Sequence, residues 1–233
     1  VAVSDLVKRL IEQVAFEARG SEFVDKKSGV SARLTISAFE NAVSAAERRA
    51  IVNNEKDTQV WINDLMGIIP SITGKIELVY EGEQEGPYQV AMNLLEKAIR
   101  TQFIQYFPNP EVLKKRARTG KPEPEGKQDN PYRSITSWFD KGNNLNIFFN
   151  TTDKDKILLL YKVDGLHSLV KKYFPHANEM ETALLMEFIL HGLSSYSLIS
   201  KKILETKVEF KDLIGSMMNL GNKNYEEEFD EEG

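Results

Sequence analysis

The chain has 233 residues, of which 41% are hydrophobic and 28% charged, a composition that is ordinary for a soluble globular protein. The formal net charge of −5 argues against a general nucleic-acid-binding protein. The lack of cysteine excludes disulfides and thiolate metal sites and fits a cytoplasmic protein, and the lack of a long apolar run argues against a membrane span.

Helical spacing dominates the first part of the chain. Apolar residues recur every three or four positions from Asp5 to Arg19, and a second helix is expected over 32–53. Ser37 and Glu40 also fit a capping box, which would start this second helix later. The apolar face expected on it consists of Ile36, Phe39, Val43, Ala46 and Ala50.

Prolines and glycines separate the next segments. A third helical segment is expected from Asn63 until Pro70, and a fourth helix over 87–106, where a proline suits the first turn. Residues 117–131 combine glycines, prolines and charges without an apolar anchor, so a linker or long loop is expected there. The basic run at 114–118 lacks interleaved aromatic residues and fits a solvated charged surface better than a nucleic-acid site.

The second half combines one candidate hairpin with further helices. Segments 135–139 and 145–149 flank a glycine turn and predict a short β-hairpin, although the first segment fits a helical turn equally well. Residues 222–233 form an acidic tail that is expected to be disordered. Helices are expected over 152–162, 166–174, 179–204 and 210–220.

The feature that points most directly to chemistry is Arg33, which follows a turn at Gly29 and stands at the beginning of the second expected helix. A helix N-terminus carries unpaired N–H groups and a partial positive charge. A guanidinium at that place is suited to meet a phosphate group. The alternative is an ordinary surface arginine that the helix dipole disfavours.

The remaining parts of a nucleotide site are missing from the sequence. No G-x-x-x-x-G-K-[ST] segment occurs, because the Gly-Lys pairs at 74–75, 120–121 and 126–127 are not followed by Ser or Thr. No acidic Walker-B strand is visible either. The chain is therefore expected not to hydrolyse ATP by itself.

Three patterns together resemble the C-terminal helical lid of AAA+ ATPases of the magnesium-chelatase I-subunit and MoxR group. They are Gly29-x-Ser31-x-Arg33, the alanine-rich run 45–50 with its two arginines, and the spacing of apolar and charged residues from 60 to 76 around Pro70. Residues beyond about Lys75 resemble the C-terminal extension of a chelatase-like branch of these ATPases, on the segments 138–142 and 187–193.

This resemblance implies that Arg33 is the sensor-2 arginine, which reaches the γ-phosphate of ATP bound by a nucleotide-binding core outside this chain. ATP and Mg²⁺ are implied as cofactors of the parent ATPase, with none held by this fragment. The implied partners are that core, neighbouring subunits of a hexameric ring, and an unknown client protein. Arg48 and Arg49 could face a neighbouring subunit's nucleotide, although a solvated face near the helix C-terminus is the simpler interpretation.

The expected fold is mostly α, with an AAA+ lid-type helical bundle followed by a helical extension that has at most one short β-hairpin. The expected division is a lid-like helical domain at 1–78, a connecting helical segment at 79–116, the linker at 117–131, a C-terminal helical domain at 132–221 and the acidic tail at 222–233.

Two other functions remain open at this stage. One is a stand-alone helical protein-interaction module or scaffold without a nucleotide. The other is an enzyme with a hidden site around Glu187 and His191, which lie four residues apart on one expected helix. A metal site is not predicted, because His167, His176 and His191 form at most pairs with nearby carboxylates, and a metal needs three or four converging ligands.

Overall fold

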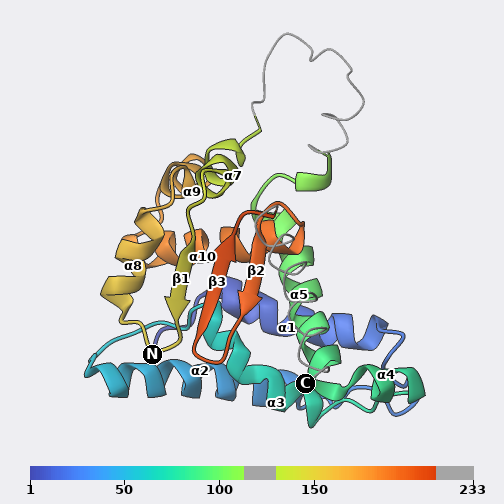
Figure 1. The fold of residues 1–233 in the computed structure, drawn as a ribbon. Coiled ribbons are helices and arrows are strands. Elements are labelled where there is room, and N and C mark those ends of the chain that lie inside the picture. Colours follow the sequence, from blue (N-terminus) through green and yellow to red (C-terminus); the bar gives the residue numbers. More distant parts are fainter. Residues whose placement is uncertain (113–129, 214–233) are drawn as a thin grey trace, which may run out of the picture.

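The computed structural model describes residues 1–112 and 130–213, and it confirms a mostly helical fold with a small antiparallel sheet (Figure 1). The predicted linker lies almost entirely outside the described residues, and the basic run 114–118 and the acidic tail lie entirely outside them. The described helices are α1 (Asp5–Gly20), α2 (Leu34–Asn53), the 3-10 helix η1 (Asn63–Ile68), α3 (Ile69–Thr73), α4 (Tyr80–Glu85), α5 (Pro87–Tyr106), α7 (Arg133–Asp140), α8 (Asp153–Tyr161), α9 (Leu166–Tyr173) and α10 (Glu179–Ser195). The strands are β1 (Leu145–Phe148), β2 (Ser200–Ile203) and β3 (Lys207–Lys211).

Most predicted helices begin where the sequence carries a capping signal. Ser4 accepts a hydrogen bond from the backbone N–H of Val7 at the start of α1, and Thr152 accepts one from Asp155 at the start of α8. Pro87 opens α5 after Gly86, whose φ of 95° suits glycine. These local signals fix the starts of the elements without reference to the rest of the molecule.

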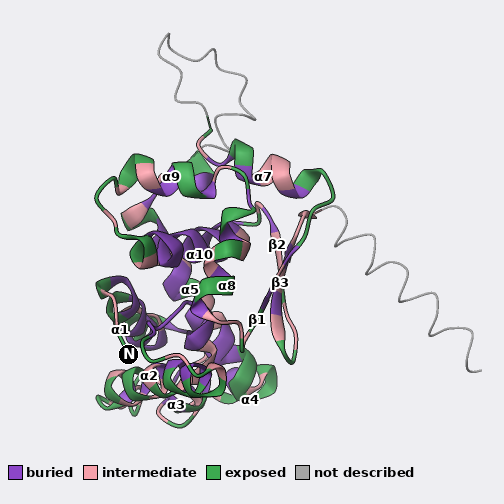
Figure 2. Ribbon diagram, turned by 90° about the vertical axis from the view of Figure 1, so that its left-hand side faces the viewer, coloured by how far each residue is buried: buried purple, intermediate pink, exposed green. Residues whose placement is uncertain are grey.

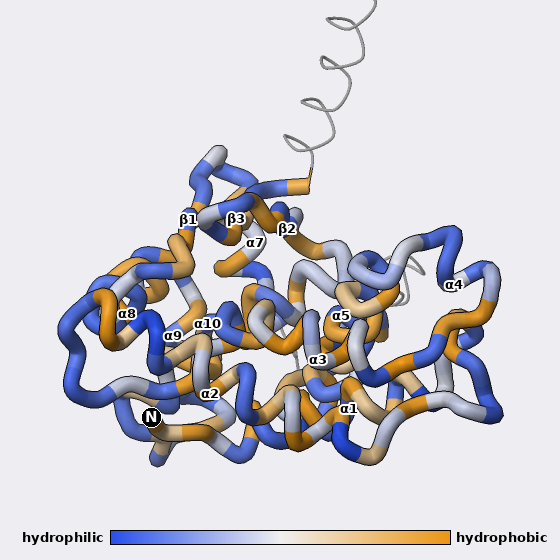
Figure 3. Tube along the Cα trace, turned by 90° about the horizontal axis from the view of Figure 1, so that it is seen from below, coloured by the Kyte–Doolittle hydropathy of each residue, from blue (hydrophilic) through white to orange (hydrophobic). Residues whose placement is uncertain are grey.

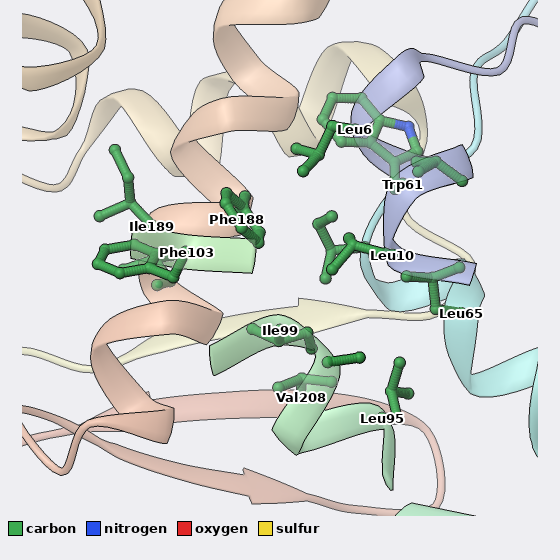
Figure 4. Close-up of a cluster of buried hydrophobic side chains, with 14 of the residues drawn as sticks. Leu6, Leu10, Trp61, Leu65, Leu95, Ile99, Phe103, Phe188, Ile189 and Val208 are labelled. Atoms are coloured by element: carbon green, nitrogen blue, oxygen red, sulfur yellow. The ribbon is translucent and has the colours of Figure 1, made fainter. Parts of the chain in front are cut away.

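The core is continuous across the whole described part of the chain. Helix α5 packs against both α1 and α10, and buried residues are concentrated in α5 and α10 at the centre of the molecule (Figure 2). The ring of Phe103 in α5 lies 5.7 Å from that of Phe188 in α10, and Leu10 of α1 lies in the same cluster (Figure 4). The hydrophobic core therefore crosses the predicted boundaries at residues 78 and 131.

The buried face of α2 contains Ala46 and Ala50, as expected, but it differs from the expected face at Ile36 and Phe39. Ile36 is 61% exposed and Phe39 is 38% exposed, whereas Ala38, Ala42 and Ala46 are buried. The reason is close packing of the helix on η1, where a Cβ added to Gly67 would lie only 3.0 Å from the Cβ of Ala45. Small residues permit this approach, so the alanine stripe faces inward, and Ile36 and Phe39 are exposed on the other side of the helix. Figure 3 shows the trace of the chain from below, coloured by hydropathy.

The hairpin lies elsewhere than predicted. Residues 135–139 form part of α7, as the alternative interpretation allowed, and β1 pairs with β3 in the order β1-β3-β2. The hairpin of the structure joins β2 to β3, in a region that the sequence predicted as the end of one helix and the beginning of another. Helix α10 ends at Ser195 because the chain turns at Ser197, whose φ is 51°. Val208 and Phe210 then alternate inward from β3, which is the pattern of a half-buried strand.

Candidate functional site: an exposed arginine and a buried polar network

Arg33 stands at the mouth of α2 on a turn that is fixed by backbone hydrogen bonds. Its own N–H donates to the hydroxyl of Ser31 (3.2 Å), and the N–H of Ser31 donates to the carbonyl of Lys75 (2.9 Å). The carbonyl of Gly29 accepts from the N–H of Glu77 (3.1 Å), and Gly29 has a φ of 55°, which favours glycine. The turn that carries Arg33 is therefore held against the segment that follows α3.

The guanidinium of Arg33 points to solvent. The residue is exposed, and within residues 1–112 and 130–213 no hydrogen bond or ion pair to its side chain is present. The sequence-based expectation of an arginine at a helix mouth is thus met in position. Among residues 1–112 and 130–213, no anion is placed against this group.

Arg49 is placed differently from either interpretation that the sequence suggested. Its side chain is only 2% exposed, and Nη1 donates to Asp153 (2.6 Å) while Nη2 donates to Asp64 (3.1 Å). Nη2 also donates to the hydroxyl of Thr58 (3.0 Å) and to the carbonyl of Gln59 (2.9 Å). A solvated face or a contact with a neighbouring subunit's nucleotide is therefore wrong for Arg49, because its donors are used inside the chain. Arg48 is exposed, and its role toward a neighbouring subunit stays a prediction.

Asp153 is the centre of the contacts around Arg49. Besides Arg49, its carboxylate accepts from the indole Nε1 of Trp61 (2.7 Å) and from the hydroxyl of Thr58 (2.9 Å). Burial tends to lower the pKa of the Arg49 guanidinium, but hydrogen bonds and charge attraction from Asp64 and Asp153 raise that pKa above its ordinary value. Asp64 and Asp153, together with Glu55, whose Oε2 lies 3.8 Å from Nη1, compensate for the burial of this cation.

A second buried ion pair continues this arrangement toward α10. The ammonium of Lys156 lies 3.3 Å from Oε1 of Glu187 and 4.6 Å from the centre of the Trp61 ring. Oε2 of Glu187 accepts from the backbone N–H of Ile62 (2.7 Å). Burial raises the pKa of the Glu187 carboxyl, and the charge of Lys156 opposes that rise.

Glu187 and His191, around which a hidden enzymatic site was considered, bond to different buried partners. Nε2 of His191 lies 2.9 Å from Oδ1 of Asn63, so this nitrogen carries the proton, and Nδ1 faces the ammonium of Lys201 (3.4 Å). Lys201 is also paired with Glu96. Most of these groups bond to one another within the fold, whereas the side-chain amide nitrogen of Asn63 is buried without a hydrogen-bond partner in the described part of the chain.

The histidines do not converge on a metal. His191 is buried, whereas His167 and His176 are exposed, and His167 packs its ring against Tyr161 at 5.0 Å. In the described part of the chain no group of three or more His, Asp or Glu side chains could hold a metal ion. None of the helices in that part is long and apolar enough to cross a membrane.

One hollow of about 460 Å³ lies where the beginnings of α1 and α10 meet the end of α5. Its lining includes the buried residues Leu6 and Leu184, the half-buried Tyr106, and the exposed acidic residues Asp5 and Glu181. It lies apart from Arg33, which does not line it.

We call the buried groups around Arg49 and Glu187 the inter-half network, because they join residues before and after the segment 113–129. Its members are Arg49, Thr58, Trp61, Asp64, Asp153, Lys156 and Glu187. The sequence interpretation missed most of them. One signal was present: Arg49 continues the stripe of Ala38, Ala42 and Ala46 at helical spacing, which places it on the buried face.

Comparison with protein-family models, with curated proteins and with solved structures finds no match for this chain.

Proposed function

We propose that this chain is the lid and C-terminal extension of an AAA+ ATPase that resembles the magnesium-chelatase I-subunit and MoxR group. In this proposal, Arg33 contacts the γ-phosphate of an ATP that a nucleotide-binding core outside this chain holds together with Mg²⁺. The extension serves to dock an unknown client protein. The chain itself is not catalytic, and the assembly is a cytoplasmic ring, which the family resemblance makes hexameric.

The observation that carries this proposal is the contrast between Arg33 and Arg49 on the same helix. Arg49 is buried and fully paired, whereas Arg33 is held on a fixed turn with its guanidinium in solvent. An arginine is suited to bind a phosphate when its backbone is held in place and the N–H groups of its guanidinium have no other partner.

The surroundings of Arg33 support the same interpretation. Ile36 follows it one turn later on the outer face of α2 and is 61% exposed, so an apolar contact surface adjoins the cation. Arg48 lies fifteen residues farther along α2, about 22 Å away at the rise of an α-helix. Arg33 and Arg48 therefore cannot reach the same phosphate, and any role of Arg48 belongs to a second site on a neighbouring subunit.

The mechanism follows from the charge of the nucleotide. An arginine fork binds the γ-phosphate while ATP is intact and loses this partner after hydrolysis and phosphate release. Because Arg33 contacts the γ-phosphate of ATP and finds no such group in ADP, the two nucleotides favour different positions of α2. A ligand can displace a helix only through such a difference in contacts. The turn at 29–33 would then pass the displacement to α2.

ATP hydrolysis by this chain assembled with its nucleotide-binding core tests the proposal. Arg33→Ala should lower kcat about 10- to 100-fold, because a charge-assisted hydrogen bond contributes roughly 1.5–3 kcal/mol. Arg133→Ala is the matched control, since Arg133 is an exposed arginine at the beginning of α7 (Figure 1). Equal rates for the two variants would overturn the role of Arg33.

The exposed apolar residues of α2 also favour the alternative of a helical protein-interaction module without a nucleotide. The two functions differ in whether a nucleotide-binding segment accompanies this chain and in whether its partner binding depends on ATP. The ATPase proposal requires a G-x-x-x-x-G-K-[ST] segment in the same reading frame ahead of Val1 or in a separate subunit that binds this chain. An interaction module needs neither, and its partner binding should be indifferent to ATP.

A further inference from the structure

We propose that the inter-half network is a rigid joint, which forces α8 and α10 to move as one body with α2. Its use in an ATPase cycle rests on the function proposed above, whereas its stiffness does not. Through this joint, a movement of α2, the helix that Arg33 precedes, is transmitted to the C-terminal half of the chain.

The first observation is that the end of α2 is bonded directly to the beginning of α8. Arg49 pairs with Asp153, and the side-chain amide of Asn53 donates to the carbonyl of Asn150 (2.9 Å). The carboxylate of Glu55 accepts from the backbone N–H of Asp153 (2.8 Å). Three independent contacts, from the last turn of α2 and just beyond it, thus converge on the first residue of α8 and the loop before it.

The second observation concerns the short segment between α2 and η1. Five polar groups of residues 58–63 bond to the second half of the chain. The contacts run from Thr58 to Asp153, from Gln59 to the carbonyl of Met180 (2.9 Å), from Trp61 to Asp153, from the N–H of Ile62 to Glu187 and from Asn63 to His191. The segment is therefore fastened to both α8 and α10.

The chemistry of these contacts makes the joint stiff. A buried charge that loses its partner is strongly unfavourable. Arg49 is 2% exposed, and Lys156 and Glu187 are 1% and 0% exposed in their side chains, so water cannot replace a lost partner. A displacement of α2 relative to α8 would separate these charges, and both helices therefore move together.

The absence of cysteine from the sequence permits a direct measurement of this stiffness on the full 233-residue chain. Cysteines introduced as Glu47→Cys on α2 and Lys162→Cys at the end of α8 replace two exposed residues and can carry spin labels. Pulsed electron paramagnetic resonance then gives the distribution of distances between them. The proposal predicts one narrow distribution, which Asp153→Ala broadens at least twofold.

Two further variants keep the test decisive. Asp153→Asn preserves the side-chain shape but removes the charge, so it should broaden the distribution to a smaller degree even if Asp153→Ala fails to fold. Asp140→Ala removes an exposed carboxylate at the end of α7 and should leave the distribution unchanged. A broad distribution in the parent, unchanged widths in both Asp153 variants, or equal broadening by Asp140→Ala would overturn the joint.

A failure of this measurement leaves the ATPase test of Arg33 untouched, because the hydrolysis rate does not depend on the label distance. Conversely, a chain without any nucleotide role can still carry a stiff joint. The two proposals therefore fail on different results.

Discussion

Removal of the Asp153 carboxylate should destabilise the protein far more than an ordinary surface substitution. Asp153→Ala removes the acceptor of the indole N–H of Trp61 and the nearest acceptors of Arg49 Nη1 and the Thr58 hydroxyl, which keep only Glu55 at 3.8 Å and the Gln59 carbonyl at 3.4 Å. Breaking a buried ion pair by deleting one partner typically costs about 3–5 kcal/mol. A small part of this loss comes from the favourable interaction of a carboxylate with the first turn of α8.

The isosteric variant separates charge from shape. Asp153→Asn can still accept hydrogen bonds from Arg49 and Trp61, so only the charge-assisted part is lost, about 1–2 kcal/mol. The loss is limited because Arg49 keeps its second carboxylate partner, Asp64. The expected order of the free energies of unfolding is therefore parent, then Asp153→Asn, then Asp153→Ala.

Urea unfolding followed by circular dichroism and by tryptophan fluorescence measures these losses, and Trp61 reports directly on the network. The midpoint should shift while the dependence on denaturant stays constant, because the variants change little of the surface that unfolding exposes. Asp140→Asn serves as the surface control and should lie within about 0.5 kcal/mol of the parent. A loss for Asp153→Ala no larger than this control would refute the assignment of a buried, interdependent network.

Two further predictions concern buried residues of α10. Burial, and then the ammonium groups of two nearby lysines, lower the pKa of His191 well below its ordinary value. His191 therefore binds a proton in the unfolded chain at a pH where it stays neutral in the folded chain. The free energy of unfolding should fall by up to about 1.4 kcal/mol per pH unit as the pH drops below about 6.5. Unfolding at several pH values should show this slope reduced in His191→Gln but retained in the exposed variant His176→Gln. A Cβ at Gly192 would lie 2.0 Å from the ring of Phe103, so Gly192→Ala should cost about 1–3 kcal/mol in denaturant unfolding despite the better helix propensity of alanine. Gly20→Ala meets no atom within 4 Å and should be neutral or stabilising, and equal effects of the two glycine substitutions would refute the argument from packing.

The parts of the fold that the sequence predicted well are those with local signals. Pro87 and the apolar spacing behind it gave the bounds of α5, and Thr152 gave the beginning of α8. The same kind of reasoning failed at the end of α10, because Ile199 and Ile203 continue a helical spacing although they lie beyond the turn at Ser197. That region instead forms a hairpin with β3, and β3 in turn pairs with β1, which lies far away in the sequence.

The buried face of α2 shows a different limit. Large apolar side chains such as Ile36 and Phe39 dominate any estimate of periodicity, but the tight approach of η1 selects the small alanines for the interior. The approach depends on Gly67, which belongs to another element. The face that a helix buries depends on its own surface and on the surface of its neighbour. The sequence of α2 describes only the first of these two surfaces.

The candidate site divides in the same way. Arg33 could be located from the glycine turn and the helix start that follow one another in sequence. The role of Arg49 could not, because its partner Asp153 lies 104 residues away and the ion pair exists only after the two halves have folded together. A buried cation is foreseen only by noticing that it continues an alanine stripe.

The most direct test of the account is a structure of the whole assembly with a non-hydrolysable ATP analogue bound to the nucleotide-binding core. If Arg33 contacts the γ-phosphate, one of its guanidinium nitrogens should lie about 2.7–2.9 Å from a γ-phosphate oxygen, the usual length of a charge-assisted hydrogen bond. A γ-phosphate that is fully coordinated by other groups, with the Arg33 side chain still in solvent, would contradict it.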